Sequence, residues 1–357
     1  MPFDNSAPAP PSVLEARRRR AVAFWLLAVA GLVWAMVAIG GATRLTGSGL
    51  SIMEWAPLAG ILPPLSEAEW NRLYDLYRTI PQYQLVNAGF GLEGFKRIFW
   101  LEWIHRFWGR LIGLAYVAGL VWFWLRGAIP RGYGRRLVIL LALGGLQGVV
   151  GWFMVASGFE ADRTAVSPYR LVAHLGLALV LYAMLLWTAL SLLRPASAAP
   201  RPDVAPALRH AIRAAALLAF VTMLAGGFVA GIRAGFDYNT FPLMDGRLIP
   251  EGYASLTPVW RNLTANVAAV QFNHRLLATA TLLAALWAGW RAWRSLPAGA
   301  LRQGALLLAG SIVLQYAVGI VTLLAVVPVA LGTLHQALAV LVLTAAVLAL
   351  HPLRSAR

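Results

Sequence analysis

The stretch "LEWIHRFWGR" at residues 101–110 places one glutamate, one histidine and two arginines in an otherwise apolar part of the chain. Its ionisable residues are Glu102, His105, Arg106 and Arg110. An ionisable side chain at the centre of a bilayer costs roughly 3 kcal/mol on insertion scales, so such residues are functional candidates wherever they lie in a membrane segment. The fold therefore depends on whether this stretch crosses a membrane.

The composition is typical of a membrane protein. Of 357 residues, 60% are hydrophobic and 12% are charged, and the mean hydropathy is +0.68. A soluble domain carries about 25% charged residues. The net charge of +16 does not indicate nucleic-acid binding, because the basic residues recur in short clusters between apolar runs. The chain has no cysteine, which excludes disulfides and thiolate metal ligands.

Eight apolar runs reach the length of roughly 20 residues that a helix needs to cross the hydrocarbon core. We therefore predict an all-α integral membrane protein with eight transmembrane helices near residues 21–42, 98–125, 136–157, 168–193, 208–233, 266–293, 301–327 and 329–351. Residues 1–20 are rich in Pro, Ala and Ser and end in four arginines, which predicts a disordered tail. The first run is longer than the apolar region of a signal peptide, so we predict that it is an uncleaved span.

The basic residues define an orientation. With eight spans, both termini lie on one side, which carries 17 Lys/Arg and 3 acidic residues, against 13 and 11 for the rest of the chain. The positive-inside rule places the more basic side in the cytoplasm. We therefore predict cytoplasmic termini, including the 1–20 tail, and outward-facing loops at about 43–97 and 234–265.

The chain repeats itself. A glycine pattern that begins at Gly40 recurs 186 positions later at Gly226. Three further pairs match: "LQGVVG" (146–151) with "LQYAVG" (314–319), "IHR" (104–106) with "NHR" (273–275), and "VAHLGLAL" (172–179) with "TLHQALAV" (333–340). The repeat predicts two pseudo-symmetric four-helix bundles, residues 21–195 and 208–352. Because four spans are an even number, both halves enter the membrane from the same side, as in parallel-repeat transporters.

Four of the six histidines lie at one depth. His105, His174, His274 and His335 occupy the even-numbered predicted spans, each six to eight residues from the outer end, or about 10 Å deep. A lone intramembrane histidine is more often a packing residue, and His210 and His351 at cytoplasmic span ends fit an interfacial role. Paired imidazoles across a four-helix bundle are the usual axial ligands of membrane haem. Zinc or copper would more often recruit carboxylates or sulfur. We therefore predict one porphyrin site in each half.

Charged residues next to these histidines suggest further roles. Arg106 and Arg275 follow a histidine directly, and their guanidinium groups are candidates to pair with haem propionates. The alternative is that they are interfacial arginines extending toward water. Glu102 lies three residues before His105 on the same helix face, whereas the matching position before His274 is Gln271. This asymmetry predicts one reactive site and one electron-carrying site. The alternative is that Glu102 balances Arg106 or Arg110.

The ordered set of motifs resembles the heme A synthase family over essentially the whole chain after the N-terminal tail. The motifs are "GGATRLTGSGLSI", "EWIHRFWGRLIG", "LVAHLGLAL", "DYNTFPLMDG", "FNHRLLA" and "LHQALAV". The resemblance implies an eight-helix protein of the bacterial or mitochondrial inner membrane, here the cell inner membrane. It also implies oxidation of the ring methyl of heme O to the formyl of heme A, through a hydroxymethyl intermediate, in support of cytochrome oxidase assembly. Some members carry a cysteine pair in an outer loop, so this chain resembles a cysteine-free branch.

The resemblance also implies site roles. His105 and His174 would ligate the iron of the heme O substrate, with Arg106 beside it, and His274 and His335 would ligate a heme b cofactor, with Arg275 beside it. Glu102 would be catalytic, as a proton acceptor or as a stabiliser of positive charge near the methyl carbon. Heme O synthase and an electron acceptor are candidate partners, and the oligomeric state, a homo-oligomer included, stays open.

Two other functions use the same features. A di-haem b electron-transfer cytochrome needs the four histidines but has no use for Glu102. A transporter fits the parallel repeat, but it would place charges near the bilayer midplane, whereas these lie near one surface. Extraction of the bound haem separates the enzyme from the cytochrome.

Overall fold

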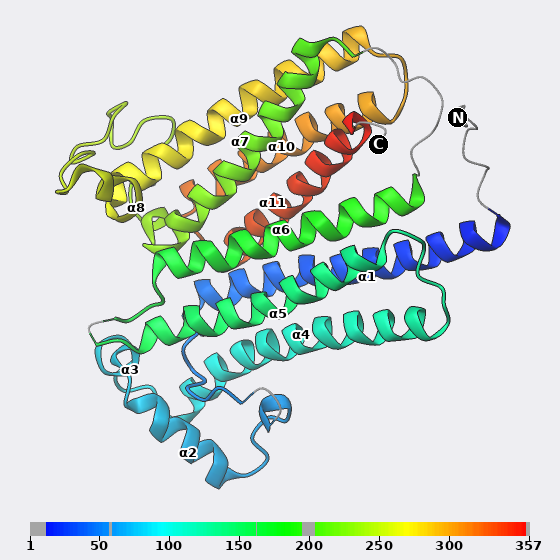
Figure 1. The fold of residues 1–357 in the computed structure, drawn as a ribbon. Coiled ribbons are helices and arrows are strands. Elements are labelled where there is room, and N and C mark those ends of the chain that lie inside the picture. Colours follow the sequence, from blue (N-terminus) through cyan, green and yellow to red (C-terminus); the bar gives the residue numbers. More distant parts are fainter. Residues whose placement is uncertain (1–11, 57–58, 162, 195–203, 355–357) are drawn as a thin grey trace, which may run out of the picture.

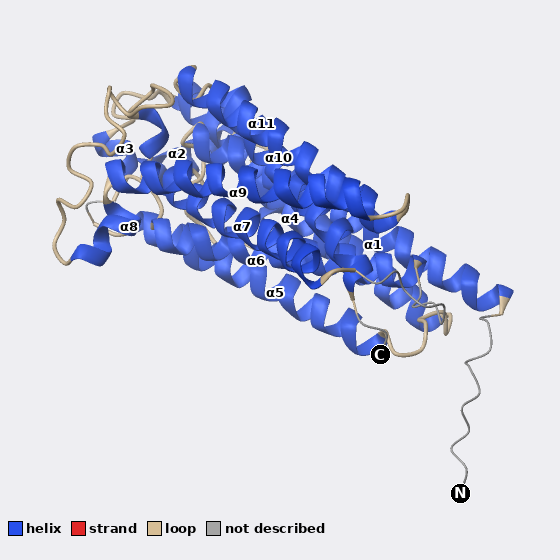
Figure 2. Ribbon diagram, turned by 90° about the horizontal axis from the view of Figure 1, so that it is seen from above, coloured by secondary structure: helices blue, strands red, loops and turns tan. Residues whose placement is uncertain are grey.

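The computed structural model describes residues 12–56, 59–161, 163–194 and 204–354, and within these ranges it contains helices and no β-strand (Figure 2). The α-helices are α1 (Val13–Leu45), α2 (Glu67–Arg78), α3 (Pro81–Leu85), α4 (Leu92–Leu125), α5 (Gly134–Ala156), α6 (Pro168–Leu193), α7 (Pro206–Gly231), α8 (Asn262–Ala265), α9 (Val267–Ser295), α10 (Ala300–Leu324) and α11 (Val329–Leu350). Short 3₁₀ helices cover Ala59–Ile61, Ser157–Phe159, Ala234–Phe236, Val259–Arg261 and His351–Leu353. The predicted all-α class is confirmed.

Helix α1 starts earlier than predicted. The Ser12 side chain accepts a hydrogen bond from the backbone N–H of Glu15, and Glu15 lies in the first turn, where a negative charge is favourable. The following arginines are good helix formers. Residues 13–20, which were predicted to belong to a disordered tail, are therefore helical. Residues 1–11 of that tail lie outside the described residues.

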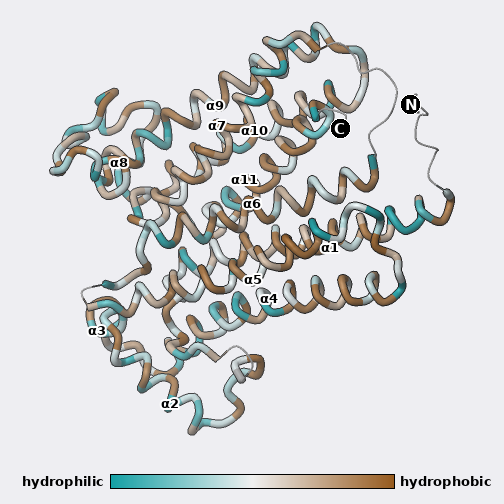
Figure 3. Tube along the Cα trace, viewed as in Figure 1, coloured by the Kyte–Doolittle hydropathy of each residue, from teal (hydrophilic) through white to brown (hydrophobic). Residues whose placement is uncertain are grey.

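Within the described residues, seven helices are long and apolar enough to cross a membrane: α1, α4, α5, α6, α7, α10 and α11. Figure 3 shows hydrophobic residues along the length of these helices and hydrophilic residues gathered mainly near their ends and in the outer loops. Helix α9 has 29 residues but is not among the seven. It carries Gln271, His274 and Arg275 near one end and Arg291 and Arg294 near the other.

The long helices run side by side (Figure 1). In the first half of the chain, α1 packs against α4 and α6, and α5 packs against both α4 and α6. In the second half, α7 and α10 each pack against both α9 and α11. Helix α1 begins and α11 ends at one end of the molecule, and α2, α3 and α8 lie at the opposite end.

Polar contacts join the two halves at α1, α6 and α11. The Trp34 indole N–H donates to the Ala337 carbonyl (3.0 Å), and the Gln336 amide donates to the Val37 carbonyl (3.0 Å). The Tyr182 and Thr344 hydroxyls lie 2.8 Å apart. Each contact satisfies a polar group between apolar helices, where water is scarce.

The first outer segment, the chain between α1 and α4, contains the helices α2 and α3. Helices α2 and α3 lie beside the outer end of α4 through a cluster of aromatic rings, with ring centroids of Trp70 and Phe99 4.8 Å apart and of Tyr77 and Phe95 5.4 Å apart. Tyr77 and Phe95 are fully buried. The second outer segment, the chain between α7 and α9, contains only the four-residue α8 among the α-helices. The two halves thus differ in the helical content of these segments.

Candidate functional site

The four predicted histidines lie on four different helices, His105 on α4, His174 on α6, His274 on α9 and His335 on α11. Each ring lies against a glycine of a neighbouring helix. A Cβ atom on that glycine would lie 2.9–3.1 Å from the nearest ring atom at Gly40 of α1, Gly151 of α5, Gly226 of α7 and Gly319 of α10. These glycines therefore provide the space for the imidazole rings, and they pair between the halves as the repeat does.

Two glutamines hold the histidines of α6 and α11. The Gln147 amide donates to the His174 backbone carbonyl (3.0 Å) and lies 3.2 Å from its Nδ1. The Gln315 amide makes the same two contacts with His335, at 2.9 Å and 3.2 Å. We assigned these glutamines no role from the sequence, although "LQGVVG" and "LQYAVG" marked them through the repeat. Groups that orient a ligating histidine commonly affect metal affinity.

The residues present fit a porphyrin in each half. All four histidines are partly exposed. The Nδ1 atom of His274 is buried without a hydrogen-bond partner. No group of three or more His, Cys, Asp or Glu side chains in the described ranges forms a metal site. Two imidazoles suit an iron that brings four equatorial nitrogens of its own.

Glu102 is buried and fully hydrogen-bonded. Its side chain belongs to α4, and the residue is only 2% exposed. Oε2 accepts hydrogen bonds from the Ser51 hydroxyl (2.7 Å) and the Ile52 backbone N–H (2.9 Å). Oε1 accepts from Nε (3.0 Å) and Nη2 (2.6 Å) of Arg106. A carboxylate has about four acceptor positions, so these four hydrogen bonds fill them.

Gln271 occupies the matching place in the second half with the opposite polarity. Its amide donates to the backbone carbonyls of Ala234 (2.6 Å) and Asp237 (2.5 Å). Its oxygen accepts from Nη2 of Arg275 (2.8 Å). The outer segment therefore presents hydrogen-bond donors to Glu102 and acceptors to Gln271. In both halves the residue connects the outer segment to the arginine one turn along the helix.

Both arginines also hold the outer segments. Arg106 donates to the carbonyls of Ile52 (2.6 Å) and Glu54 (2.9 Å). Arg275 donates to the carbonyls of Tyr238 and Thr240, at 2.5 Å and 2.8 Å, which lie 186 positions after Ile52 and Glu54. The contacts of these two arginines with the outer segments therefore follow the sequence repeat. The pairing of these arginines with haem propionates stays a prediction.

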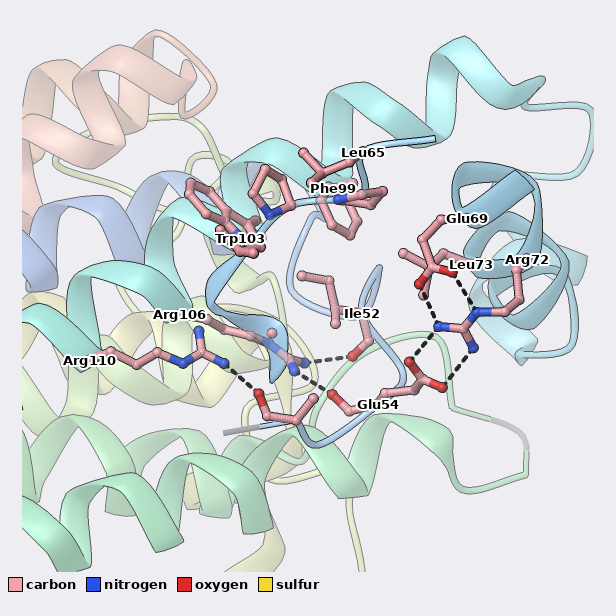
Figure 4. A pocket seen from close by; sticks show the side chains of 15 residues that line it. Ile52, Glu54, Leu65, Glu69, Arg72, Leu73, Phe99, Trp103, Arg106 and Arg110 are labelled. Atoms are coloured by element: carbon pink, nitrogen blue, oxygen red, sulfur yellow. Dashed lines mark hydrogen bonds and ion pairs between the residues drawn. The ribbon is translucent and has the colours of Figure 1, made fainter. Parts of the chain in front are cut away.

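A pocket lies beside Arg106, between α4, α2 and residues 52–56 and 60–65 (Figure 4). Arg110 donates to the Ala56 carbonyl (2.9 Å) at its edge. Arg72 of α2 forms ion pairs with Glu54 and Glu69, both at 2.8 Å. Hydrogen bonds from the Arg72 guanidinium hold the pKa of both carboxyls below the ordinary glutamate value. This cluster fastens α2 to the segment that contacts Arg106.

Comparisons with known proteins show the family to which the chain belongs. The family model described as cytochrome oxidase assembly protein, COX15-CtaA, matches residues 23–347. The chain is 56% identical over 343 residues to the heme A synthase of Granulibacter bethesdensis, covering 96% of this chain and 90% of the relative. It is 51% identical to that of Rhodospirillum centenum (98% and 92% covered) and 50% identical to that of Parvibaculum lavamentivorans (93% and 94% covered).

Proposed function

The chain belongs to the COX15-CtaA family of cytochrome oxidase assembly proteins, and we propose that it is a heme A synthase in which the two halves have different tasks. It is an enzyme of heme A biosynthesis that oxidises heme O. In overall balance, the ring methyl and one water give the hydroxymethyl group, two protons and two electrons. A second oxidation of the same kind, with another water, gives the hydrated aldehyde, which loses water to leave the formyl group.

The proposed architecture has eight spans in two four-helix bundles, residues 21–195 and 208–352. It is supported by the packing of the long helices in each half. In the first half, each of α1, α4, α5 and α6 packs against two others of this set, and in the second half the same holds for α7, α9, α10 and α11. Helix α9 is the eighth span. Its 29 residues correspond to about 44 Å of helix, more than the hydrocarbon core of about 30 Å.

The substrate haem belongs in the first half, between His105 and His174, and a heme b cofactor in the second, between His274 and His335. The observation that carries this assignment is the contrast between Glu102 and Gln271, because only the first half offers an ionised carboxylate beside its histidine pair. Helices α2 and α3 add a second difference, since the matching segment of the second half contains only the four-residue α8. A heme b held by His274 and His335 would supply one-electron redox chemistry.

Glu102 acts as a fixed negative charge near the methyl carbon. Four hydrogen bonds occupy its acceptor positions, so an incoming proton would have to displace Arg106, Ser51 or the Ile52 N–H. This favours stabilisation of developing positive charge over proton acceptance. Preorganised charges of this kind act without reorganisation during the reaction.

The protein lies in the cell inner membrane with cytoplasmic termini. The end at which α1 begins and α11 ends also carries the predicted basic loops, as the positive-inside rule requires. Both histidine pairs then lie toward the outer surface. Heme O synthase is the proposed source of the substrate, and a further redox partner takes up the electrons.

The test is expression in membranes that also contain a source of heme O, followed by haem extraction. Heme A or its hydroxymethyl intermediate is the expected product, together with heme b. Recovery of heme b alone, with heme O unchanged, would show an electron-transfer cytochrome instead.

A further inference from the structure

We propose that Ser51 is a positioning residue for the oxidation: its hydroxyl, together with the Ile52 N–H, fixes the orientation of the Glu102 carboxylate. This inference rests on the proposed function, and it extends that function to a residue outside the histidine helices. Ser51 lies in the outer segment that follows α1, 51 positions before Glu102 in the sequence.

The contact is buried on both sides. Ser51 and Glu102 are each only 2% exposed, and the hydroxyl lies 2.7 Å from Oε2. The backbone around Ser51 is itself held, since its N–H donates to the Ser48 carbonyl (3.2 Å). Hydrogen bonds to a buried charged group are among the stronger ones in proteins. The hydroxyl is therefore placed to act on the carboxylate and is shielded from water.

Each carboxylate oxygen has its own set of donors. Oε1 is bound by Arg106, and Oε2 is bound by Ser51 and Ile52. The Ile52 peptide also accepts from Arg106 through its carbonyl (2.6 Å). Because the two oxygens are held from different directions, the carboxylate plane cannot turn without breaking several bonds. Without the Ser51 hydroxyl, Oε2 keeps a single donor and the plane gains freedom.

The second half shows that this hydroxyl accompanies the carboxylate. The residue 186 positions after Ser51 is Asp237. It faces Gln271 with its backbone carbonyl, which accepts from the amide. There the contact is made by backbone carbonyls alone, whereas the hydroxyl of Ser51 supplies one of the two donors to Oε2 of Glu102. Its presence opposite Glu102 is explained by the need to hold an ionised group in one orientation.

The experiment compares Ser51→Ala, Ser51→Thr and Ser48→Ala in the full-length membrane protein supplied with heme O. Ser48 is a matched control, because it is 1% exposed in the same segment but its hydroxyl contacts Thr46. We measure kcat and KM for conversion of heme O, and haem content per chain from the optical spectrum. Loss of one hydrogen bond to a charged group that acts in the transition state lowers the rate about 10- to 100-fold.

The expected result is a kcat for Ser51→Ala that is about tenfold or more below wild type, with KM and haem content unchanged. Ser51→Thr, which keeps the hydroxyl, restores most of the rate, and Ser48→Ala behaves as wild type. A wild-type kcat in Ser51→Ala overturns the proposal, as does equal loss in Ser51→Thr or a parallel loss of haem. Wild-type protein that makes no heme A would instead refute the proposed function, so the two failures are distinguishable.

Discussion

Glu102 and Gln271 occupy equivalent places in the two halves. Each contacts an outer segment, Glu102 as a hydrogen-bond acceptor and Gln271 as a donor. Each joins an outer segment to the arginine four residues later, Arg106 or Arg275. The amide of Gln271 donates to two carbonyls, whereas the carboxylate of Glu102 accepts from a hydroxyl and an N–H. An uncharged side chain is sufficient in the second half, where the segment presents carbonyls. In the first half, Glu102 also forms an ion pair with Arg106, so its assignment to the chemistry rests on the fact that only this half has a carboxylate at the matching position.

The largest expected effects come from removing one histidine in each half. His335→Ala takes away a ligand of the proposed heme b, so heme b should be lost and heme A formation should stop. His174→Ala should also stop heme A formation but leave the heme b spectrum intact. Haem extraction and reduced-minus-oxidised spectra of both variants check the assignment. The same spectral loss in both variants would contradict a division of tasks between the halves.

Gln271→Glu tests whether the second outer segment needs a hydrogen-bond donor at position 271. The variant turns a carboxylate oxygen toward the carbonyls of Ala234 and Asp237, which now accept from the amide. Two hydrogen bonds are lost and a buried charge gains only Arg275 as a partner, so we expect a loss of about 3 kcal/mol in stability. The measurement is thermal unfolding in detergent with heme b release as the signal. Gln271→Met, which removes the bonds without adding charge, is the control and should lose less.

The glycines behind the rings predict a smaller effect. A Cβ at Gly319 would lie 2.9 Å from Cε1 of His335, and one at Gly151 would lie 2.9 Å from Cε1 of His174. Gly319→Ala and Gly151→Ala should each displace one ring and weaken haem retention about 10- to 100-fold in their own half. Gly310 and Gly145 are controls on the same two helices, because a Cβ there meets no atom within 4 Å. Equal haem retention in all four variants would show that the rings have room to move.

The smallest effect concerns the ion pairs of α2. Arg72 lowers the pKa of Glu54, so the pair stabilises the outer segment above the ordinary glutamate value of 4.5, and this contribution is lost as the pH falls through the lowered value. Arg72→Ala should lower the apparent Tm by about 1–2 °C at pH 7, since the pair is largely exposed. At pH values below the lowered pKa of Glu54 the two proteins should converge. A difference that persists in acid would mean that Arg72 acts through packing.

Much of the fold could be predicted from the sequence, because long apolar runs and an internal repeat can be recognised without knowledge of the structure. Helix α2 was missed although Ser66 and Glu69 form the start of a capping box, with the Ser66 side chain accepting from the Glu69 N–H (3.2 Å). The site was predicted in part. The sequence repeat showed that Gln271 stands at the position that matches Glu102. It did not show that Ser51 and Ile52 donate hydrogen bonds to Glu102. Which backbone groups of residues 51–52 and 234–237 face inward depends on turns that the sequence pattern does not specify.

The contrast between the halves assigns the oxidation to the carboxylate of Glu102 and gives the second half a haem without such a carboxylate. Glu102→Gln tests this most directly, because the amide keeps the volume and one acceptor for Arg106, as Gln271 does for Arg275. The measurement is haem extraction from this variant supplied with heme O. The expected result is two haems per chain, heme O and heme b, and at least about a 100-fold loss of heme A. Formation of heme A at the wild-type rate would show that the oxidation does not need the carboxylate of Glu102.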